Sequence, residues 1–407
     1  MALVQTDPLS DNFPSRSTTI YLDHAATTPL DPRVEAAMQP FGSDKFGNPS
    51  SMYLLARESR RSIDAARDLV ADLLGARNTE ILFTSGGSES DNAAMKGVAF
   101  AHHGRGHIVT TQIEHHAVLR SAEFLETLGC RVTYLQTDEF GRVGPDDVAR
   151  AIQPDTILVS VMLANNEIGT IEPISEISTV TRARRVPLHV DAVQAAGFLD
   201  LDVDRLGADL LSLSGHKFNG PKGVGILYIR RGTNCWPLLH GGGQERGRRA
   251  GTENVAGIVG FSEALRFAAE ERSERVGRVT ALRDRVIRGI LEKIPNTLLT
   301  GHPIDRLPNL ASFCFAEISG ESLLLALDSR GIMVSTGSAC TSGSLEPSHV
   351  LLAIHVPNDF VPGSLRVSMG YRNTDEEIER FLGTLPSVIQ RLREEFQPSA
   401  ERSASFP

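Results

Sequence analysis

Between residues 54 and 230 the chain alternates amphipathic stretches with short apolar runs. The first stretch ends at a glycine, Gly75, and lines up five apolar side chains on one helical face: Ile63, Ala66, Val70, Leu73 and Leu74. The runs that follow are EILFT, HIVTT, RVTYL, TILVSVML, PLHVD, ADLLSLS and GVGILYIR. Several are apolar almost throughout, as strands covered on both faces must be. The pattern predicts a three-layer α/β domain with a mostly parallel sheet.

The pattern changes at a long helical stretch, 255–294. It is followed by segments of mixed type, NLASFCF, ESLLLAL, GIMVS and SLRVSMG, and by a final charged helix. We therefore expect a large domain over 17–260 and a smaller α+β domain over 261–396. Both ends are polar, which predicts an N-terminal arm, 1–16, that could pack on the small domain, and a loose tail, 397–407.

Composition narrows the class of protein. The 407 residues carry a net charge of -9, and their lysines and arginines form no basic stripe. Nucleic-acid backbones are bound by clustered cations, so we expect no nucleic-acid surface. No apolar run approaches twenty residues, and the N-terminus lacks a charged and then apolar leader. We expect a cytoplasmic protein that does not bind a membrane.

The four cysteines are Cys130, Cys235, Cys314 and Cys340, and none stands in a CxxC pair. We therefore expect neither a metal centre nor a disulfide framework. Cys314 lies in the apolar run ASFCFA, which favours a place in the core, and Cys130 has an equally structural setting. Cys340 lies in STGSACTSGS, whose small side chains build no apolar pocket. An accessible thiol in a pliable loop suits sulfur chemistry, although this stretch alone does not distinguish that role from burial.

Ligands of a parallel sheet bind at the carboxyl ends of its strands, so the residues after each strand are the first candidates for a binding site. EILFT leads into TSGGSESDNAAMKG, where Ser88 and Asp91 have capping-box spacing at a predicted helix start. The amides of Gly87 and Ser88 would form an anion site there, and a plain capped turn is the alternative. Neither a Walker A motif nor GxGxxG is present, so a nucleotide is not indicated.

Two further strand ends carry polar groups. Asp191 and Gln194 follow PLHV, and a carboxylate at the end of an apolar strand calls for a cationic partner such as a pyridinium nitrogen. Ser214, His216 and Lys217 follow ADLLSL, which places an amine beside small residues before a glycine-rich turn. A phosphate cup, a carboxylate and an amine are the three anchors of pyridoxal phosphate.

At this point a family resemblance appears. The ordered motifs run from about Tyr21 to Gly370 and comprise YLDHAATTP, FGNPSS, TSGGSESDN, TQIEHHAVL, ANNEIG, HVDAVQ, SLSGHKFNGPKG, HGGGQERGRRAGTEN and STGSACTSGSLEPS. This set resembles the signature of the pyridoxal-phosphate-dependent cysteine desulfurases of the NifS/IscS group. The resemblance implies a fold type I pyridoxal-phosphate transferase, with a large three-layer domain and a smaller α+β domain.

The resemblance also assigns roles around the cofactor. Lys217 would hold pyridoxal phosphate as a Schiff base and take the α proton of the substrate, and Asp191 would pair with the ring nitrogen. His115 would stack on the ring and exchange protons, while Gln194 would contact the phenolic oxygen. The phosphate would be bound by Gly87, Ser88, Ser214 and His216.

Further implied roles concern substrate, partner subunit and sulfur. Thr252 of AGTEN would reach the cofactor phosphate of a neighbouring subunit, which implies a homodimer. Asn166 would contact cofactor and substrate, and Arg366 would grip the substrate carboxylate with Asn48 nearby. Cys340 would attack the sulfur of L-cysteine, leaving L-alanine and a persulfide on Cys340. That sulfur would go to an acceptor or scaffold protein, as in iron-sulfur cluster assembly.

Several of these residues keep a structural alternative. His115 and His116 could be a solvated pair or a fragment of a metal site, although no third ligand stands at the required spacing. Asn165 and Asn166 could cap a turn, and Arg366 could face a structural carboxylate.

Other functions also remain open at this point. A selenocysteine lyase or an aminotransferase would share the fold and the cofactor, and an iron-sulfur carrier would use the four cysteines as ligands. HGGG is typical of the oxyanion loop of esterases, but no GxSxG elbow accompanies it, so a serine hydrolase is disfavoured.

Overall fold

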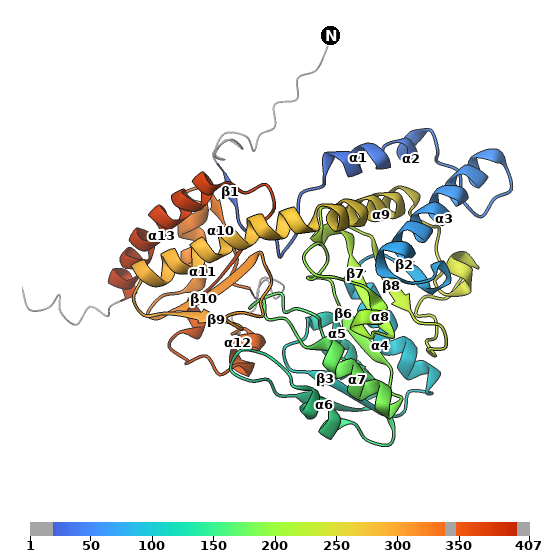
Figure 1. Ribbon diagram of the computed structural model, residues 1–407, viewed down its shortest axis with the longest axis horizontal. Coiled ribbons are helices and arrows are strands. Elements are labelled where there is room, and N and C mark those ends of the chain that lie inside the picture. Colours follow the sequence, from blue (N-terminus) through green and yellow to red (C-terminus); the bar gives the residue numbers. More distant parts are fainter. Residues whose placement is uncertain (1–18, 338–346, 397–407) are drawn as a thin grey trace, which may run out of the picture.

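The computed structural model describes residues 19–337 and 347–396, which Figure 1 shows as ribbons. The predicted arm 1–16, the predicted tail 397–407 and the candidate thiol of Cys340 lie outside the described residues. The largest sheet has seven strands in the order β2-β8-β7-β6-β5-β3-β4. Its strands are β2 (Ile81–Thr84), β3 (His107–Thr111), β4 (Arg131–Leu135), β5 (Thr156–Ser160), β6 (Leu188–Asp191), β7 (Leu210–Ser214) and β8 (Gly225–Ile229).

Each of the seven apolar runs of the sequence forms one strand of this sheet. Strands β4, β3, β5, β6 and β7 run parallel to one another, whereas β8 runs antiparallel to both β7 and β2. The prediction of a mostly parallel sheet is confirmed. The carboxyl ends of β3, β5, β6 and β7 therefore meet at one edge, where the candidate residues follow.

Helices cover both faces of the sheet and complete the three layers (Figure 1). Alternate strand residues enter two separate apolar clusters: Ile226 and Tyr228 of β8 face one, and Leu227 and Ile229 face the other. The α-helices of the described residues are α1 (Pro32–Met38), α2 (Pro40–Ser43), α3 (Leu54–Leu74), α4 (Gly87–Ala101), α5 (His116–Thr127), α6 (Pro145–Ala151), α7 (Ile174–Arg184), α8 (Val203–Leu206), α9 (Val255–Glu270), α10 (Arg272–Lys293), α11 (Gly320–Asp328), α12 (His349–Ala353) and α13 (Asp375–Phe396).

The two apolar clusters involve different helices. The first cluster includes residues of α3, α7 and α9, and the second includes residues of α4 and α5.

The C-terminal part has its own sheet and core. Strands β9 (Thr297–Thr300), β10 (Leu310–Phe315) and β12 (Ser364–Ser368) form an antiparallel sheet in the order β12-β10-β9. The N-terminal strand β1 (Ile20–Tyr21) joins this part by pairing in parallel with β11 (Ile332–Met333). Ile20 and Leu22 belong to the same apolar cluster as residues of α10, α11 and α13.

Helices α9 and α10 connect the two parts. The single predicted helical stretch 255–294 is two helices, with Glu271 between them. Phe261 and Leu265 of α9 still pack in the core beneath the large sheet, whereas Leu282 and Val286 of α10 pack in the C-terminal core. We propose that the boundary between the two domains lies near Glu271.

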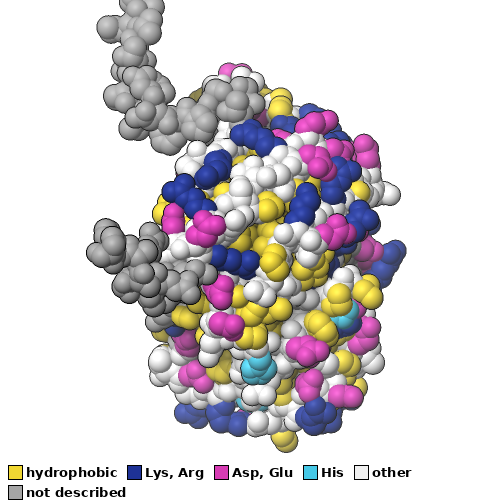
Figure 2. Space-filling model, turned by 90° about the vertical axis from the view of Figure 1, so that its left-hand side faces the viewer, with side chains coloured by type: hydrophobic (Ala, Val, Ile, Leu, Met, Phe, Trp, Pro, Cys, Tyr) yellow, Lys and Arg dark blue, Asp and Glu magenta, His cyan; other side chains and the backbone are white. Residues whose placement is uncertain are grey.

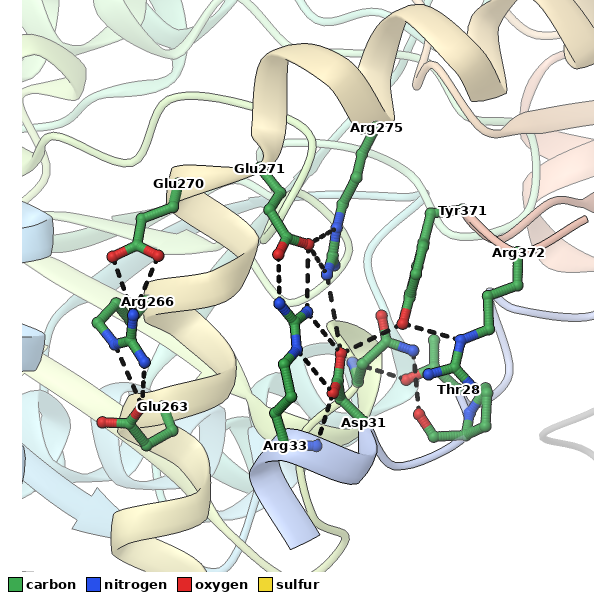
Figure 3. Close-up of polar contacts among 12 residues, drawn as sticks. Thr28, Asp31, Arg33, Glu263, Arg266, Glu270, Glu271, Arg275, Tyr371 and Arg372 are labelled. Atoms are coloured by element: carbon green, nitrogen blue, oxygen red, sulfur yellow. Dashed lines mark hydrogen bonds and ion pairs between the residues drawn. The ribbon is translucent and has the colours of Figure 1, made fainter. Parts of the chain in front are cut away.

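Ion pairs surround this joint (Figure 3). Arg33 at the start of α1 pairs with both Asp31 and Glu271. Arg275 of α10 also bonds Glu271, and its guanidinium lies 4.1 Å from the centre of the Tyr371 ring. The network thus ties α1, the α9–α10 joint and the segment after β12 together.

The outer surface is mixed in character. On the face shown in Figure 2, acidic and basic side chains are interspersed, with apolar side chains between them. Within residues 19–337 and 347–396, no helix is long and apolar enough to cross a bilayer.

Candidate active site

A cavity of about 200 Å³ opens at the carboxyl ends of the parallel strands. It collects residues that follow β2, β3, β5, β6 and β7, together with residues from both ends of the chain. Ten of the predicted site residues line it: Gly87, Ser88, His115, Asn166, Asp191, Gln194, Ser214, His216, Lys217 and Arg366. A larger cleft of about 470 Å³ beside Arg33 and Arg275 contains none of them, so we place the candidate site in the smaller cavity.

Two predicted residues do not line the cavity. Asn48 and Thr252 are exposed in the single chain, and Asn48 Oδ1 accepts the Ser50 N–H at 3.0 Å within its own loop. Cys340 lies outside the described residues, and Gly337, three residues before it, lines the cavity.

Lys217 ends a short 3₁₀ turn that directly follows β7. Its Nζ donates to the carbonyl oxygens of Ala25 and Ala26. Thr28 fixes the turn from both sides, because its hydroxyl donates to the His216 carbonyl at 2.8 Å and accepts the Asn219 N–H at 2.8 Å. The amine is therefore held at the cavity wall by the N-terminal segment.

Asp191 is the last residue of β6 and is buried. Its Oδ1 accepts the Val193 N–H at 3.0 Å. Burial raises the pKa of this carboxyl, while the Val193 amide and the nearby Lys217 act in the opposite direction. The site thus presents a buried carboxyl group to the cavity, where a cationic ligand nitrogen would stabilise its charged form.

The helix that follows β2 begins differently from the sequence prediction. Helix α4 starts at Gly87 with Gly86 as its N-cap, so Ser88 lies inside the first turn and does not cap it. The capping-box prediction for Ser88 and Asp91 is wrong because Gly86, at a φ of 150°, lets the chain enter the helix earlier. Asp91 points into the interior, and its side chain is 2% exposed.

The tight packing at Gly87 explains why a glycine stands there. A Cβ at this position would lie 2.8 Å from Val193 Cγ2. Without one, the first amides of a 15-residue helix lie at the cavity wall, which is a favourable place for an anion.

Two histidines line the cavity in the neutral form at pH 7. His115 caps α5 through Nδ1, which accepts the Ala117 N–H at 3.1 Å, so the ring proton lies on Nε2. Burial, and then the charge of Lys217, lower the pKa of His115 to about 4. The same two causes lower the pKa of His216 to about 4, and its Nδ1 lies 3.1 Å from Thr27 Oγ1.

Arg366 is buried at the cavity and also meets a carboxylate. One Nη donates to the Asn166 carbonyl and the other to Asp23 Oδ1, both at 2.8 Å, while Nε is buried without a recorded partner. The turn-capping alternative holds for Asn165, whose Oδ1 accepts the Glu167 and Ile168 N–H groups. Asn166 instead lines the cavity.

The sequence reasoning missed three contributors. Asp23 orients Arg366, the carbonyls of Ala25 and Ala26 hold Lys217, and Asp91 forms part of the cavity wall. Asp23, Ala25 and Ala26 all lie in the motif YLDHAATTP. The position of Asp23, a charged residue directly after a short strand, is the feature of the sequence that could indicate a site there.

Two of the cysteines have the core positions that the sequence predicts. Cys130 and Cys314 are buried in apolar clusters, which confirms the core prediction for both. In the part of the chain that the structure describes, no group of three His, Cys, Asp or Glu side chains is arranged to hold a metal ion.

Comparison with known proteins adds to this geometry. The class-V aminotransferase family matches residues 20–381. The cysteine desulfurase IscS of Methanosarcina thermophila is 53% identical over 384 residues, covering 94% of this chain and 95% of the relative. The chain belongs to the cysteine desulfurases of the class-V aminotransferase family. The predicted membership of the NifS/IscS group is confirmed.

Solved structures agree with this membership. A NifS-like protein aligns with a TM-score of 0.87 at 38% identity, covering 92% of this chain and all of the other. A structure described as SspA in complex with cysteine aligns with a TM-score of 0.76 at 37% identity, covering 88% of this chain and all of the other. The predicted fold of this pyridoxal-phosphate-dependent family is confirmed.

Proposed function

We propose that this chain, a pyridoxal-phosphate-dependent cysteine desulfurase, uses Lys217 and Asp191 to hold its cofactor and Cys340 to receive the sulfur. The observation that carries the proposal is one cavity in which an amine, a buried carboxyl group and a guanidinium fork meet at strand ends. Cofactor dependence and desulfurase activity belong to the family, and the residue roles are inferred from this cavity.

The residues fit the cofactor at each of its polar ends. Gly87 and Ser88, at the positive end of α4, would bind the phosphate with Ser214 and His216. Asp191 would pair with the ring nitrogen, whose positive charge offsets the cost of a buried carboxylate. Two buried polar atoms at the cavity, Asp91 Oδ1 and Arg366 Nε, have no recorded partner, as expected where a polar ligand belongs.

When bound, pyridoxal phosphate draws electrons away from the α carbon of an amino acid. Lys217 would hold its aldehyde covalently, release it to the substrate amine, and then accept the α proton. His115 would contact the ring and return a proton through Nε2, and Gln194 would contact the phenolic oxygen. Arg366, already oriented by Asp23, would bind the substrate carboxylate beside Asn166.

The last step transfers the sulfur of the substrate to Cys340. The thiolate of Cys340 attacks the sulfur of L-cysteine, the carbon–sulfur bond breaks, and the carbon takes a proton to become L-alanine. Cys340 is left as a persulfide, so no external oxidant or reductant is required. The position of Gly337 supports this role of Cys340. Gly337 lines the cavity, and the three residues from there to Cys340 span at most about 10 Å of chain.

We further propose a homodimer in which Thr252 reaches the cofactor phosphate of the neighbouring subunit. Thr252 is exposed and does not line the cavity of its own chain, which is compatible with this role. The segment around Asn48 also exposes large apolar side chains, with Met52 at 89% and Phe46 at 68%. The contact of Asn48 with substrate remains a prediction.

The destination of the sulfur is proposed from the names of the relatives and the sequence resemblance. We propose transfer to an acceptor protein or a scaffold, as in iron-sulfur cluster assembly, within the cytoplasm. Mixing the persulfidated enzyme with cell extract and identifying the first labelled protein would test this destination.

The thiol assignment has a direct test. Cys340→Ala should lose L-alanine production from L-cysteine by more than about 100-fold, because a covalent step loses its nucleophile. The matched control is Cys235→Ala, which removes a half-buried thiol outside the cavity and should keep parent activity. Alanine is measured with no keto acid present, which excludes an aminotransferase reaction. Full turnover by Cys340→Ala would show that another group accepts the sulfur.

A further inference from the structure

A row of buried polar side chains runs along the side of the sheet that faces α4. Ser160 of β5, His189 of β6 and Ser212 of β7 are each fully buried. Ser160 Oγ lies 2.8 Å from His189 Nδ1, and His189 Nε2 lies 3.0 Å from Ser212 Oγ. Because strand residues alternate between faces, His189 and Asp191 share this side of β6. The row therefore leads toward Asp191 at the cavity.

Asp91 of α4 lies beside this row, next to His189. Its side chain is 2% exposed, it lines the cavity, and its Oδ1 has no hydrogen-bond partner among the described residues. Within 4 Å, the only basic nitrogen among the described residues is His189 Nε2, at 3.7 Å from Oδ1. Burial lowers the pKa of His189 to about 3, so its ring is neutral and supplies no compensating charge.

The surroundings of Asp91 oppose a second negative charge. Two acidic groups act on it: Asp191 from β6, and to a smaller degree Glu114 from the segment after β3, whose own pKa is raised by burial to about 8. Burial, and then the charge of Asp191, raise the pKa of Asp91 well above its ordinary range, and Ser212 offsets this only partly. Asp191 has two stabilising neighbours, the Val193 amide and Lys217. Two buried carboxyl groups that line one small cavity retain one proton between them, and Asp91 is the better place for it.

We propose that Asp91 is a positioning residue that stays protonated in the working enzyme, so that the cavity floor carries one negative charge, on Asp191. The inference rests on the proposed placement of pyridoxal phosphate with its ring nitrogen at Asp191. A protonated carboxyl group is a neutral donor and acceptor, and a carboxamide has nearly the same shape and the same neutrality. An amide should therefore replace Asp91, whereas an apolar side chain of similar size should not.

The experiment compares Asp91→Asn, Asp91→Leu and Ser212→Ala, with Asp72→Leu on the exposed surface of α3 as the control. Cofactor-free protein is titrated with pyridoxal phosphate to obtain the dissociation constant. The absorption band of the bound cofactor is then followed against pH. Circular dichroism verifies that each variant is folded, and Ser212→Ala tests the same row without altering a carboxyl group.

Asp91→Asn should bind the cofactor within about threefold of the parent and keep the pH midpoint of the band, because no charge is lost. Asp91→Leu should bind about tenfold more weakly, since it leaves the polar row unpaired, and Ser212→Ala should weaken binding in the same direction. Asp72→Leu should match the parent.

Two results would overturn the proposal. A pH midpoint that moves by about one unit or more in Asp91→Asn would mean that Asp91 is ionised in the parent. Parent-like binding by Asp91→Leu would mean that the side chain only fills space. Failure of the unaltered chain to bind pyridoxal phosphate would instead contradict the proposed function, so the two failures are distinguishable.

Discussion

Glu114 shows how strongly burial acts on a single side chain beside the site. It is fully buried, and Oε1 accepts the Thr111 hydroxyl at 2.7 Å and the Met162 N–H at 3.0 Å, while Oε2 has no recorded partner. Burial raises the pKa of Glu114 from 4.5 to about 8, and Asp191 adds to the shift. The folded chain therefore holds a proton at pH 7 that the unfolded chain releases.

This proton makes stability depend on pH. The contribution of Glu114 is fully present below the unfolded pKa of 4.5 and is lost as pH rises through about 8. Glu114→Gln cannot lose a proton, so its free energy of unfolding should fall less steeply with pH. The difference in slope should reach about 1.4 kcal/mol per pH unit between pH 5 and pH 8.

Urea unfolding at several pH values measures that slope. Glu123→Gln on the exposed side of α5 is the matched control and should follow the parent. Parallel curves for the parent and Glu114→Gln would contradict the assignment of a buried, protonated Glu114.

Residues that follow strands could be predicted from the sequence, since the end of an apolar run marks where a polar side chain reaches a ligand. Lys217 and Asp191 stand directly at such ends. Asp23 could not be matched to Arg366 this way, because 343 residues separate them and only the folded chain brings them together. The spacing of Asp91 from Ser88 predicts a helix cap, and no local pattern indicates the interior position of its side chain.

At the scale of elements, packing at the start of α4 affects the proposed cofactor site. A Cβ at Gly87 would lie 2.8 Å from Val193 Cγ2 and 3.5 Å from Ser214 Cβ. Val193 follows Asp191 by two residues, and its main-chain N–H donates a hydrogen bond to Asp191 Oδ1. A methyl group at Gly87 would therefore push against the segment that holds Asp191.

Gly87→Ala should weaken pyridoxal phosphate binding by about tenfold, because Val193 or the helix start must move. Gly277→Ala in α10 is the control, since nothing lies within 4 Å of its added Cβ. It should leave cofactor binding unchanged and raise the free energy of unfolding by up to about 1 kcal/mol. Cofactor titration measures the first effect and urea unfolding the second, and parent-like binding by Gly87→Ala would contradict the packing argument.

Element types could be predicted because strands buried on both faces need continuous apolar runs. Element ends were less predictable. At the break between α9 and α10, Glu271 pairs with Arg33 of α1, which is distant in the sequence, and with Arg275 one turn further along α10. No local pattern in 255–294 marks that break.

At the scale of the whole molecule, the site depends on both ends of the chain. Ala25 and Ala26 come from the segment after β1, and Arg366 comes from β12, yet both reach the cavity formed by the large sheet. The pairing of β1 with β11 explains this, because it carries the N-terminal segment to the C-terminal part. The sequence indicated such a meeting only through its family resemblance, since it requires contacts across more than 300 residues.

The most direct test of the account asks whether the side-chain amine of Lys217 binds the cofactor. Borohydride reduction of the enzyme loaded with pyridoxal phosphate fixes the cofactor to the lysine that holds it, and mass spectrometry of the peptides locates that lysine. The account predicts one labelled residue, Lys217, and no label in Lys217→Ala. A label on Lys222 or on any other lysine of the parent enzyme would contradict it.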